Sequence, residues 1–221
     1  MLKIVVFDCG YGGELFADRL EESLPVVEII RVIDWRHADE IQSSPKRARD
    51  HAQAALRPYI GRVDLIVFAN HLLSATSLKY FQRKYKTQKF LGFNLKIPDT
   101  YIKHDVLVLA TKPLTKTIAY RNFLFRLKRK TKTFTPDTWP AKIDDGLLTE
   151  SEIQAELSNI TANSKFNPRE AILACSQFSD IKSELRNVLG HNLRIYDSFD
   201  EAIYRVNKIL KIRGGAIKKN K

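Results

Sequence analysis

Short apolar runs that end in small or polar residues recur along this chain and alternate with segments of helical periodicity. Runs of this length, rich in Val, Ile and Leu, are typical of strands buried on both faces of a parallel sheet. The expected strands are residues 2–8, 26–33, 63–68, 89–93, 106–110, 171–174 and 193–196. The expected helices are residues 14–23, 46–56, 72–85, 115–128, 150–160, 180–189 and 199–212. The alternation predicts an α/β fold with helices on both sides of parallel sheets.

A weak internal repeat divides the chain into two similar halves. Residues 65–71 superpose on residues 172–177 with Ala69 opposite Cys175, and the first strand superposes on residues 106–112. We therefore expect two flavodoxin-like α/β halves that face each other across a cleft. Pro98 is the expected crossing point between them, and residues 131–148 are expected to be strand or loop. The expected domains are residues 1–97 with the C-terminal helix 199–221, and residues 98–198.

The chain contains only two cysteines, and each ends a predicted strand. Cys9 follows the first strand and Cys175 follows the strand at 171–174. In open α/β sheets, ligands bind at the carboxyl ends of the strands, although a lone cysteine is more often a small buried apolar residue. Two cysteines do not make a disulfide framework, which favours a reducing, cytoplasmic compartment. No Cys/His spacing resembles a zinc site, so we expect no metal.

A glycine-rich stretch joins the first strand to the first helix. Residues 10–13 read Gly-Tyr-Gly-Gly and predict a tight turn before a helix that begins at Glu14. Backbone amides of such a turn and of a helix N-terminus form a seat for an anion such as a carboxylate. The stretch is neither the dinucleotide-binding glycine pattern nor a P-loop.

The chain is strongly basic, with a formal net charge of +12. The basic residues gather around 79–89, around 121–132 and in the tail 211–221. Solvated faces and a loose tail are the commoner explanation of such groups, so nucleic acid is a less favoured partner. Four aromatic residues are interleaved with them and are expected in the core, namely Tyr80, Tyr85, Phe123 and Phe125. No apolar window approaches the roughly 18 residues of a membrane span, and no leader-like segment opens the chain.

Four stretches, in order, carry a family resemblance. They are Asp8–Gly13, Ile66–Ala75, Leu109–Thr111 with Ala119–Tyr120, and Leu173–Phe178 followed by Leu189–Gly190 and Asp197–Ser198. They resemble conserved blocks of the aspartate/glutamate racemase superfamily, and glutamate racemase most closely. The resemblance implies a cofactor-independent racemase in which one thiolate removes the α-proton and a second thiol returns it on the opposite face. It also implies D-glutamate supply for peptidoglycan, a small amino-acid or dicarboxylate ligand and possible homodimers.

The resemblance also implies roles for individual residues. Cys175 would be an acid/base, and Asp8 would support it or bind the amino group of the substrate. A histidine candidate, His71, follows the third strand and has the intrinsic pKa for proton transfer. The substrate-binding residues expected from the matched motifs are Cys9, Gly10, Gly12, Gly13, Asn70, Thr111, Ser176 and Gln177.

The sequence departs from the family pattern at the residues that exchange protons. Ala69 stands where the first catalytic cysteine falls, His71 stands for the threonine after it, and Gln177 stands for the histidine after the second cysteine. The Pro-Tyr-Gly motif expected after the second strand is absent from residues 34–45, and Leu114 stands for a family threonine.

Three functions follow from these departures. The first is a racemase with altered bases, in which Cys175 serves one face of the substrate and His71 or Cys9 the other. The second is single-cysteine carbanion chemistry such as decarboxylation, as in the arylmalonate decarboxylase branch of the superfamily, where one thiol acid suffices. The third is a racemase-like protein that no longer catalyses and binds a small carboxylate or a polyanion. The first two functions would make the chain an enzyme, and the third would not.

Overall fold

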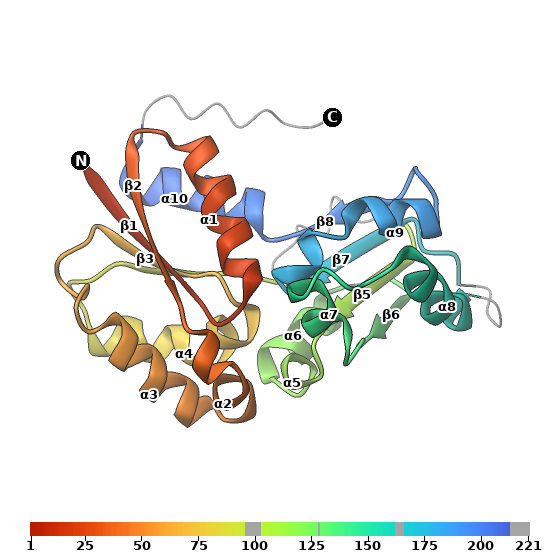
Figure 1. The fold of residues 1–221 in the computed structure, drawn as a ribbon, viewed down its shortest axis with the longest axis horizontal. Helices are drawn as coiled ribbons and strands as arrows, with labels where there is room; N and C mark the ends of the chain where they lie inside the picture. The colour runs from red at the N-terminus through yellow and green to blue at the C-terminus, as the bar shows by residue number, and fades with distance from the viewer. Residues whose placement is uncertain (96–102, 128, 162–165, 213–221) are drawn as a thin grey trace. The chain divides into compact units, whose positions relative to one another are not determined.

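A computed structural model describes residues 1–95, 103–127, 129–161 and 166–212 of the chain. The chain folds into two compact units, one formed by Met1–Asn94 with Ser198–Lys221 and the other by Leu95–Asp197 (Figure 1). Each unit contains one four-stranded sheet in which all neighbouring strands are parallel. The predicted fold class is therefore confirmed as α/β with two parallel sheets. Pro98, Lys128 and the tail beyond residue 212 lie outside the described residues.

The sheet of the first unit has the order β2-β1-β3-β4. Its strands are β1 (Leu2–Asp8), β2 (Val27–Ile33), β3 (Leu65–Phe68) and β4 (Phe90–Gly92). Side chains alternate between the two faces of a strand. In β1, Ile4 and Val6 enter one hydrophobic cluster, while Val5 and Phe7 enter the other. This two-sided burial explains why β1 is an unbroken apolar run.

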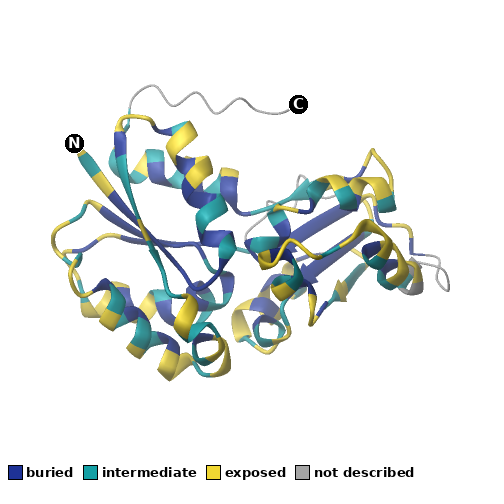
Figure 2. Cartoon of the chain, in the orientation of Figure 1, coloured by how far each residue is buried: buried dark blue, intermediate teal, exposed yellow. Residues whose placement is uncertain are grey.

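Helices cover both faces of this sheet. On one face lie α1 (Tyr11–Ser23) and α10 (Phe199–Leu210), and on the other lie α3 (Pro45–Leu56) and α4 (His71–Lys84). Between β2 and α3 the chain forms a 3₁₀ turn, Trp35–His37, and the short helix α2 (Ala38–Ser43). Figure 2 shows the central strands buried and the helices exposed on their outer sides. Helix α10 thus returns the end of the chain to the first unit.

The second unit repeats the arrangement of the first. Its strands are β5 (Val106–Ala110), β6 (Thr131–Phe134), β7 (Glu170–Ala174) and β8 (Arg194–Tyr196), in the order β6-β5-β7-β8. Its helices are α5 (Lys112–Thr115), α6 (Ile118–Arg126), α7 (Trp139–Asp144), α8 (Glu150–Thr161) and α9 (Lys182–Leu189), with a 3₁₀ turn at Gln177–Ser179. Strands β5 and β7 hold the places of β1 and β3, the same pairs that the sequence repeat superposes.

The glycine-rich stretch is helical rather than a tight turn. Helix α1 begins at Tyr11, and the Gly13 amide donates to the Gly10 carbonyl at 3.1 Å. A Cβ on Gly13 would lie 2.4 Å from Cβ of Asp8, closer than real Cβ contacts. Glycine is therefore required here by the close approach of helix and strand, which overrides its low helix propensity.

Other predicted elements also needed correction. The single helix expected at 115–128 is divided, because Thr117 caps α6 by accepting from the Tyr120 amide at 3.1 Å. Residues 131–148 contain both a strand and the helix α7, which begins at the buried Trp139.

The aromatic residues expected in the core are not all buried. Phe123 is buried and Tyr85 partly buried, but Phe125 is 90% exposed and Tyr80 is 40% exposed. Helical spacing therefore placed Phe123 on the inner face of α6 and Phe125 on its outer face. Among the described residues, no helix has the length and apolarity needed to cross a membrane.

Candidate functional site

The strand order sets where a ligand site is expected in each unit. In the first unit α1 leaves β1 toward one face of the sheet, and α4 leaves β3 toward the other. The carboxyl ends of these neighbouring strands form the topological switch point, at which open α/β sheets bind ligands. Cys9 follows β1, and Asn70 follows β3. In the second unit Thr111 follows β5 and Cys175 follows β7.

Three predicted site residues form a hydrogen-bonded cluster at the switch point of the first unit. The buried Asp8 carboxylate accepts from the Cys9 amide at 2.6 Å and from Asn70 Nδ2 at 2.9 Å. Asn70 Nδ2 also lies 3.6 Å from Cys9 Sγ. The other end of the Asn70 amide caps α4, because its Oδ1 accepts from the Leu73 amide at 2.9 Å. The Asp8 carboxylate therefore fixes the backbone of Cys9 and the Asn70 amide, and the Asn70 amide faces the Cys9 thiol.

Helix α1 presents its N-terminus beside this cluster. Gly12 and Gly13 are buried in its first turn, and Gly10 precedes the helix in an extended conformation. The first amides of a helix lack intrahelical partners and favour negative charge. The structure thus has a helix start here and not the turn that the glycines predicted, and the carboxylate seat stays a prediction.

His71 is buried at the first residue of α4. Its Nε2 lies 2.8 Å from Ser198 Oγ, and its ring packs edge-on against Phe93 with centroids 5.2 Å apart. Ala69, which stands where the family has its first catalytic cysteine, has an exposed fraction of 0%. These contacts give His71 a structural role in the first unit. A catalytic role for His71 stays a prediction.

Cys175 is the thiol at the switch point of the second unit. It is 9% exposed, and its Sγ donates to Gln177 Oε1 at 3.2 Å. Gln177 in turn donates from Nε2 to Asp144 Oδ1 at 2.7 Å and faces the Pro140 carbonyl at 3.4 Å. This chain of contacts orients the Gln177 amide with its oxygen toward the thiol.

The remaining predicted residues of the second unit lie near Cys175 in the sequence or at the next strand. Ser176 is buried, and Thr111 is half-buried just before α5. Asp197, from the Asp-Ser pair, accepts from Lys182 and lies 3.3 Å from Ser179 Oγ. These contacts fix the turn that follows Cys175 against the end of β8.

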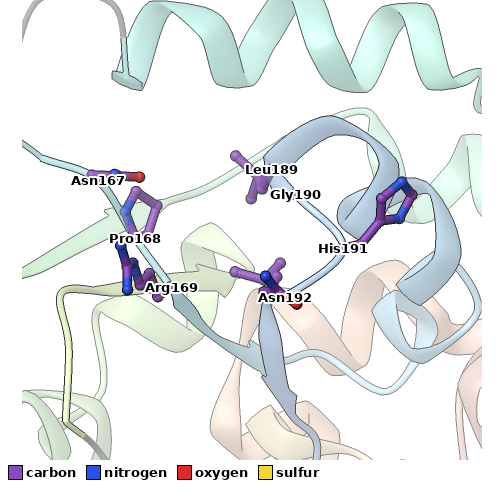
Figure 3. Close-up of a pocket in the computed structure, with 8 residues that line it drawn as sticks. Asn167, Pro168, Arg169, Leu189, Gly190, His191 and Asn192 are labelled. Carbon is purple, nitrogen blue, oxygen red and sulfur yellow. The ribbon is translucent and has the colours of Figure 1, made fainter.

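A surface pocket of the second unit lies away from these residues. Figure 3 shows its lining, which comes from the segments that lead into β7 and β8. It therefore lies at the amino-terminal edge of the sheet, opposite the edge at which Cys175 lies. Its lining contains no cysteine or carboxylate, and its histidine, His191, is not one of the residues predicted to transfer protons.

The structure also brings together residues that the sequence did not single out. Asp34, His37 and His51 lie at the end of β2, and one ligand atom from each falls within 4.8 Å of the others. Their spacing matches no zinc motif. The available signal was an acidic residue at the end of a strand with a histidine three residues later.

Comparisons with known proteins agree with the fold. The glutamate racemase of Vibrio vulnificus (strain YJ016) is 24% identical over 213 residues, which cover 94% of this chain and 81% of the relative. The crystal structure of Escherichia coli glutamate racemase in complex with L-glutamate and activator UDP-MurNAc-ala has a TM-score of 0.82 at 20% identity, and the match covers 95% of this chain and 82% of that one. Glutamate racemase from Francisella tularensis in complex with D-glutamate has a TM-score of 0.78 at 19% identity, over 95% and 81% of the two chains. No family model matches the chain.

The two four-stranded parallel sheets with their helices have the fold of solved glutamate racemases. The similarity in sequence extends over nearly the whole chain and suggests an amino-acid racemase. More particularly, the relatives that this chain resembles are glutamate racemases. The Escherichia coli structure contains L-glutamate, and the Francisella tularensis structure contains D-glutamate.

Proposed function

We propose that this chain is a cofactor-independent amino-acid racemase that acts on glutamate or a similar small amino dicarboxylate. The observation that carries the proposal is the Cys175 thiol, which lies at the switch point of its sheet and donates to Gln177 at 3.2 Å. Similarity to glutamate racemase over 94% of the chain supports it. The family resemblance makes D-glutamate for peptidoglycan the corresponding product.

Cys175 is suited to deliver a proton to a carbanion at the substrate Cα. Its S–H bond already points at an acceptor, the neutral amide oxygen of Gln177. The amide of Gln177 does not exchange protons near neutral pH, so it orients the thiol and does not replace it as an acid. In the reverse reaction the same sulfur removes the α-proton as a thiolate.

Inversion at Cα needs a second acid/base, and the methyl side chain of Ala69 cannot act as one. Cys9 and His71 are the two candidates in the first unit. Cys9 Sγ faces an amide donor, Asn70 Nδ2 at 3.6 Å, which would orient the sulfur. His71 has the suitable intrinsic pKa but is held by Ser198 in the core.

The carboxylates of the substrate need donors. The proposed donors are the amide of Gly12 at the start of α1 in the first unit and the hydroxyls of Thr111 and Ser176 in the second. The N–H groups of Asn70 and Gly13 already donate within the protein, so these residues shape the site. Asp8 acts chiefly as a positioning residue, because its Oδ1 accepts from both Cys9 and Asn70.

A second candidate function is the binding of a small carboxylate without racemisation. It is favoured by the methyl group of Ala69, which is fully buried where a proton-exchanging thiol is expected. The same substitution suits a reaction that needs only one thiol acid, such as decarboxylation.

Exchange of the α-proton in D2O separates these functions. Each enantiomer of glutamate and aspartate is incubated with the protein, and the Cα–H signal and optical configuration are followed by NMR and polarimetry. The racemase proposal expects exchange with inversion, reduced by a factor of about 10² to 10⁴ in Cys175→Ala. Exchange without inversion would instead support one-base chemistry.

A matched control is Ser23→Ala, which removes an exposed hydroxyl bonded to the Arg19 carbonyl and should leave exchange unchanged. Absence of exchange with all four substrates, together with saturable binding of glutamate by calorimetry, would contradict the racemase and support the binding protein. If both exchange and binding are absent, both functions are wrong.

A further inference from the structure

Two histidines and an aspartate meet at the carboxyl end of β2, in the first unit. One ligand atom from each of Asp34, His37 and His51 lies within 4.8 Å of the others. All three residues are half-buried, with side-chain exposures of 14%, 39% and 22% in that order. They are therefore accessible to an ion from solvent while being held by neighbouring structure.

The local fold brings the first two side chains to the same side. Asp34 follows β2, and its backbone amide donates to the Asp8 carbonyl at 2.9 Å, which fixes it beside β1. The next residues form the 3₁₀ turn Trp35–His37, in which side chains three residues apart eclipse. As a result, His37 Nδ1 lies 2.7 Å from Asp34 Oδ1.

The third side chain comes from a separate helix. His51 lies in α3, which packs against the same face of the sheet as α4 (Figure 1). Its ring stacks on the ring of His37, with centroids 4.0 Å apart and an interplanar angle of 22°. The arrangement is therefore built by two elements and does not depend on a single flexible loop.

We propose that Asp34, His37 and His51 bind one divalent first-row transition-metal ion, with Zn²⁺ as the best fit. Zn²⁺ and the other late first-row transition-metal ions are coordinated by imidazole nitrogens together with carboxylate oxygens, whereas Mg²⁺ and Ca²⁺ prefer oxygen ligands alone. Small side-chain shifts would bring atoms within 4.8 Å of one another to the roughly 2.0–2.2 Å bonds of such an ion. Three protein ligands leave a coordination position open.

A second carboxylate supports the cluster. Glu40 Oε2 lies 3.0 Å from His51 Nε2 and 3.7 Å from Arg47 Nη1. A carboxylate that holds one nitrogen of an imidazole orients the ring and makes it a better ligand. Glu40 is thus a positioning residue for His51.

The proposed ion lies on the same edge of the sheet as the Asp8–Cys9–Asn70 cluster, because Asp34 and Asp8 end neighbouring strands. Two of the proposed ligands, Asp34 and His37, lie in residues 34–45, the segment that lacks the Pro-Tyr-Gly motif of the resembling family. The proposed metal site therefore lies partly in a segment where this chain departs from the family pattern. The metal-site proposal does not depend on the proposed racemase activity.

Zinc binding by the full chain, freed of any affinity tag and of metal by chelator treatment, tests the proposal. Calorimetric titration with ZnCl₂ at neutral pH is expected to show one ion per chain. His37→Gln and His51→Gln should each weaken binding by a factor of about 100 or more, and Glu40→Gln by a factor of about 10 to 100. His191→Ala removes an exposed histidine of the second unit and should bind zinc as the unaltered chain does.

Cobalt spectroscopy distinguishes this site from binding by the two thiols. Co²⁺ held by imidazole and carboxylate gives visible d–d bands, whereas thiolate ligands add a charge-transfer band in the near ultraviolet. Circular dichroism confirms that each variant is folded. The proposal is overturned if no stoichiometric zinc binds, if binding persists in the folded His37→Gln/His51→Gln double variant, or if the cobalt complex shows the thiolate band.

Discussion

His71 and Ser198 are 127 residues apart in the sequence, and their side chains are joined by a hydrogen bond of 2.8 Å. Ser198 Oγ itself donates to the Asn94 carbonyl at 3.2 Å. Since a hydroxyl has one proton, Ser198 must accept from His71, which places the imidazole proton on Nε2. The contact ties the start of α10 to the start of α4 and so holds the returning end of the chain to the first unit.

Removing this hydroxyl should destabilise the first unit. Ser198→Ala deprives the buried His71 Nε2–H and the Asn94 carbonyl of a partner, at a cost of about 1–3 kcal/mol. Urea denaturation should show a lower midpoint with an unchanged slope. Ser23→Ala, whose hydroxyl bonds the Arg19 carbonyl in an exposed position, is expected to change the midpoint little. Equal effects from the two variants would contradict this account of the contact.

Gly13→Ala should damage both stability and ligand binding. The new Cβ would lie 2.4 Å from Asp8 Cβ and 2.8 Å from Ile33 Cδ1, so α1 must move away from β1, at a cost of about 3 kcal/mol. That movement also displaces Asp8, which holds Cys9 and Asn70. Thermal denaturation and glutamate binding measure the two effects.

Gly61→Ala is the comparison for the Gly13 variant. A Cβ on Gly61 meets no atom within 4 Å, but the φ of +78° is strained for alanine, at a cost of about 1–2 kcal/mol. Gly61→Ala should lower stability without changing ligand binding. If Gly13→Ala bound glutamate as tightly as the unaltered chain, the proposed role of Asp8 in positioning would be wrong.

The strands and the switch-point residues were predictable from the sequence because each depends on local pattern. A strand buried on both faces must be apolar throughout, so β1 and β5 are found at the expected residues. Residues that directly follow such strands, such as Cys9 and Asn70, then lie at the same edge of the sheet, because parallel strands all end at that edge wherever the helices pack.

The contacts that depend on tertiary packing were not predictable. Gln177 meets Asp144, 33 residues earlier, only because α7 packs against the turn that follows β7. His51 reaches His37 only because α3 returns to the end of β2. Segment 35–45 is polar and too short for a clear period, so its 3₁₀ turn and α2 carried no sequence signal.

Ala69→Cys should restore part of the family chemistry. The alanine is fully buried at the end of β3, so the extra sulfur will lower stability, by about 1–3 kcal/mol. If a missing second acid/base limits inversion, the variant should racemise glutamate at least about 10-fold faster than the unaltered chain. Enantiomer-resolved NMR in D2O measures this rate.

Ala17→Cys is the matched control, because it adds a thiol at another fully buried alanine, within α1 and away from the strand ends. It should lose stability without gaining activity. A folded Ala69→Cys that gains no activity would show that a missing base is not what limits this chain, and it would favour the binding function.

The start of α8 should make the stability of the second unit depend on acid pH. Glu152 Oε2 accepts from the Thr149 amide and hydroxyl, each at 3.0 Å, and the Glu152 amide faces Thr149 Oγ1 at 3.4 Å, which is a capping box. Hydrogen bonds from Lys142 and then from Thr149 lower the pKa of Glu152 from 4.5 to about 2. Because the pKa of Glu152 in the folded protein lies below that in the unfolded chain, the carboxylate stabilises the fold above about pH 4.5, and this contribution is lost as the pH falls toward 2.

Glu152→Gln and Thr149→Ala should both reduce the free energy of unfolding at neutral pH and flatten its decline between pH 4.5 and 2, as measured by urea denaturation at a series of pH values. A decline in Glu152→Gln as steep as in the unaltered chain would mean that other carboxylates govern the acid sensitivity.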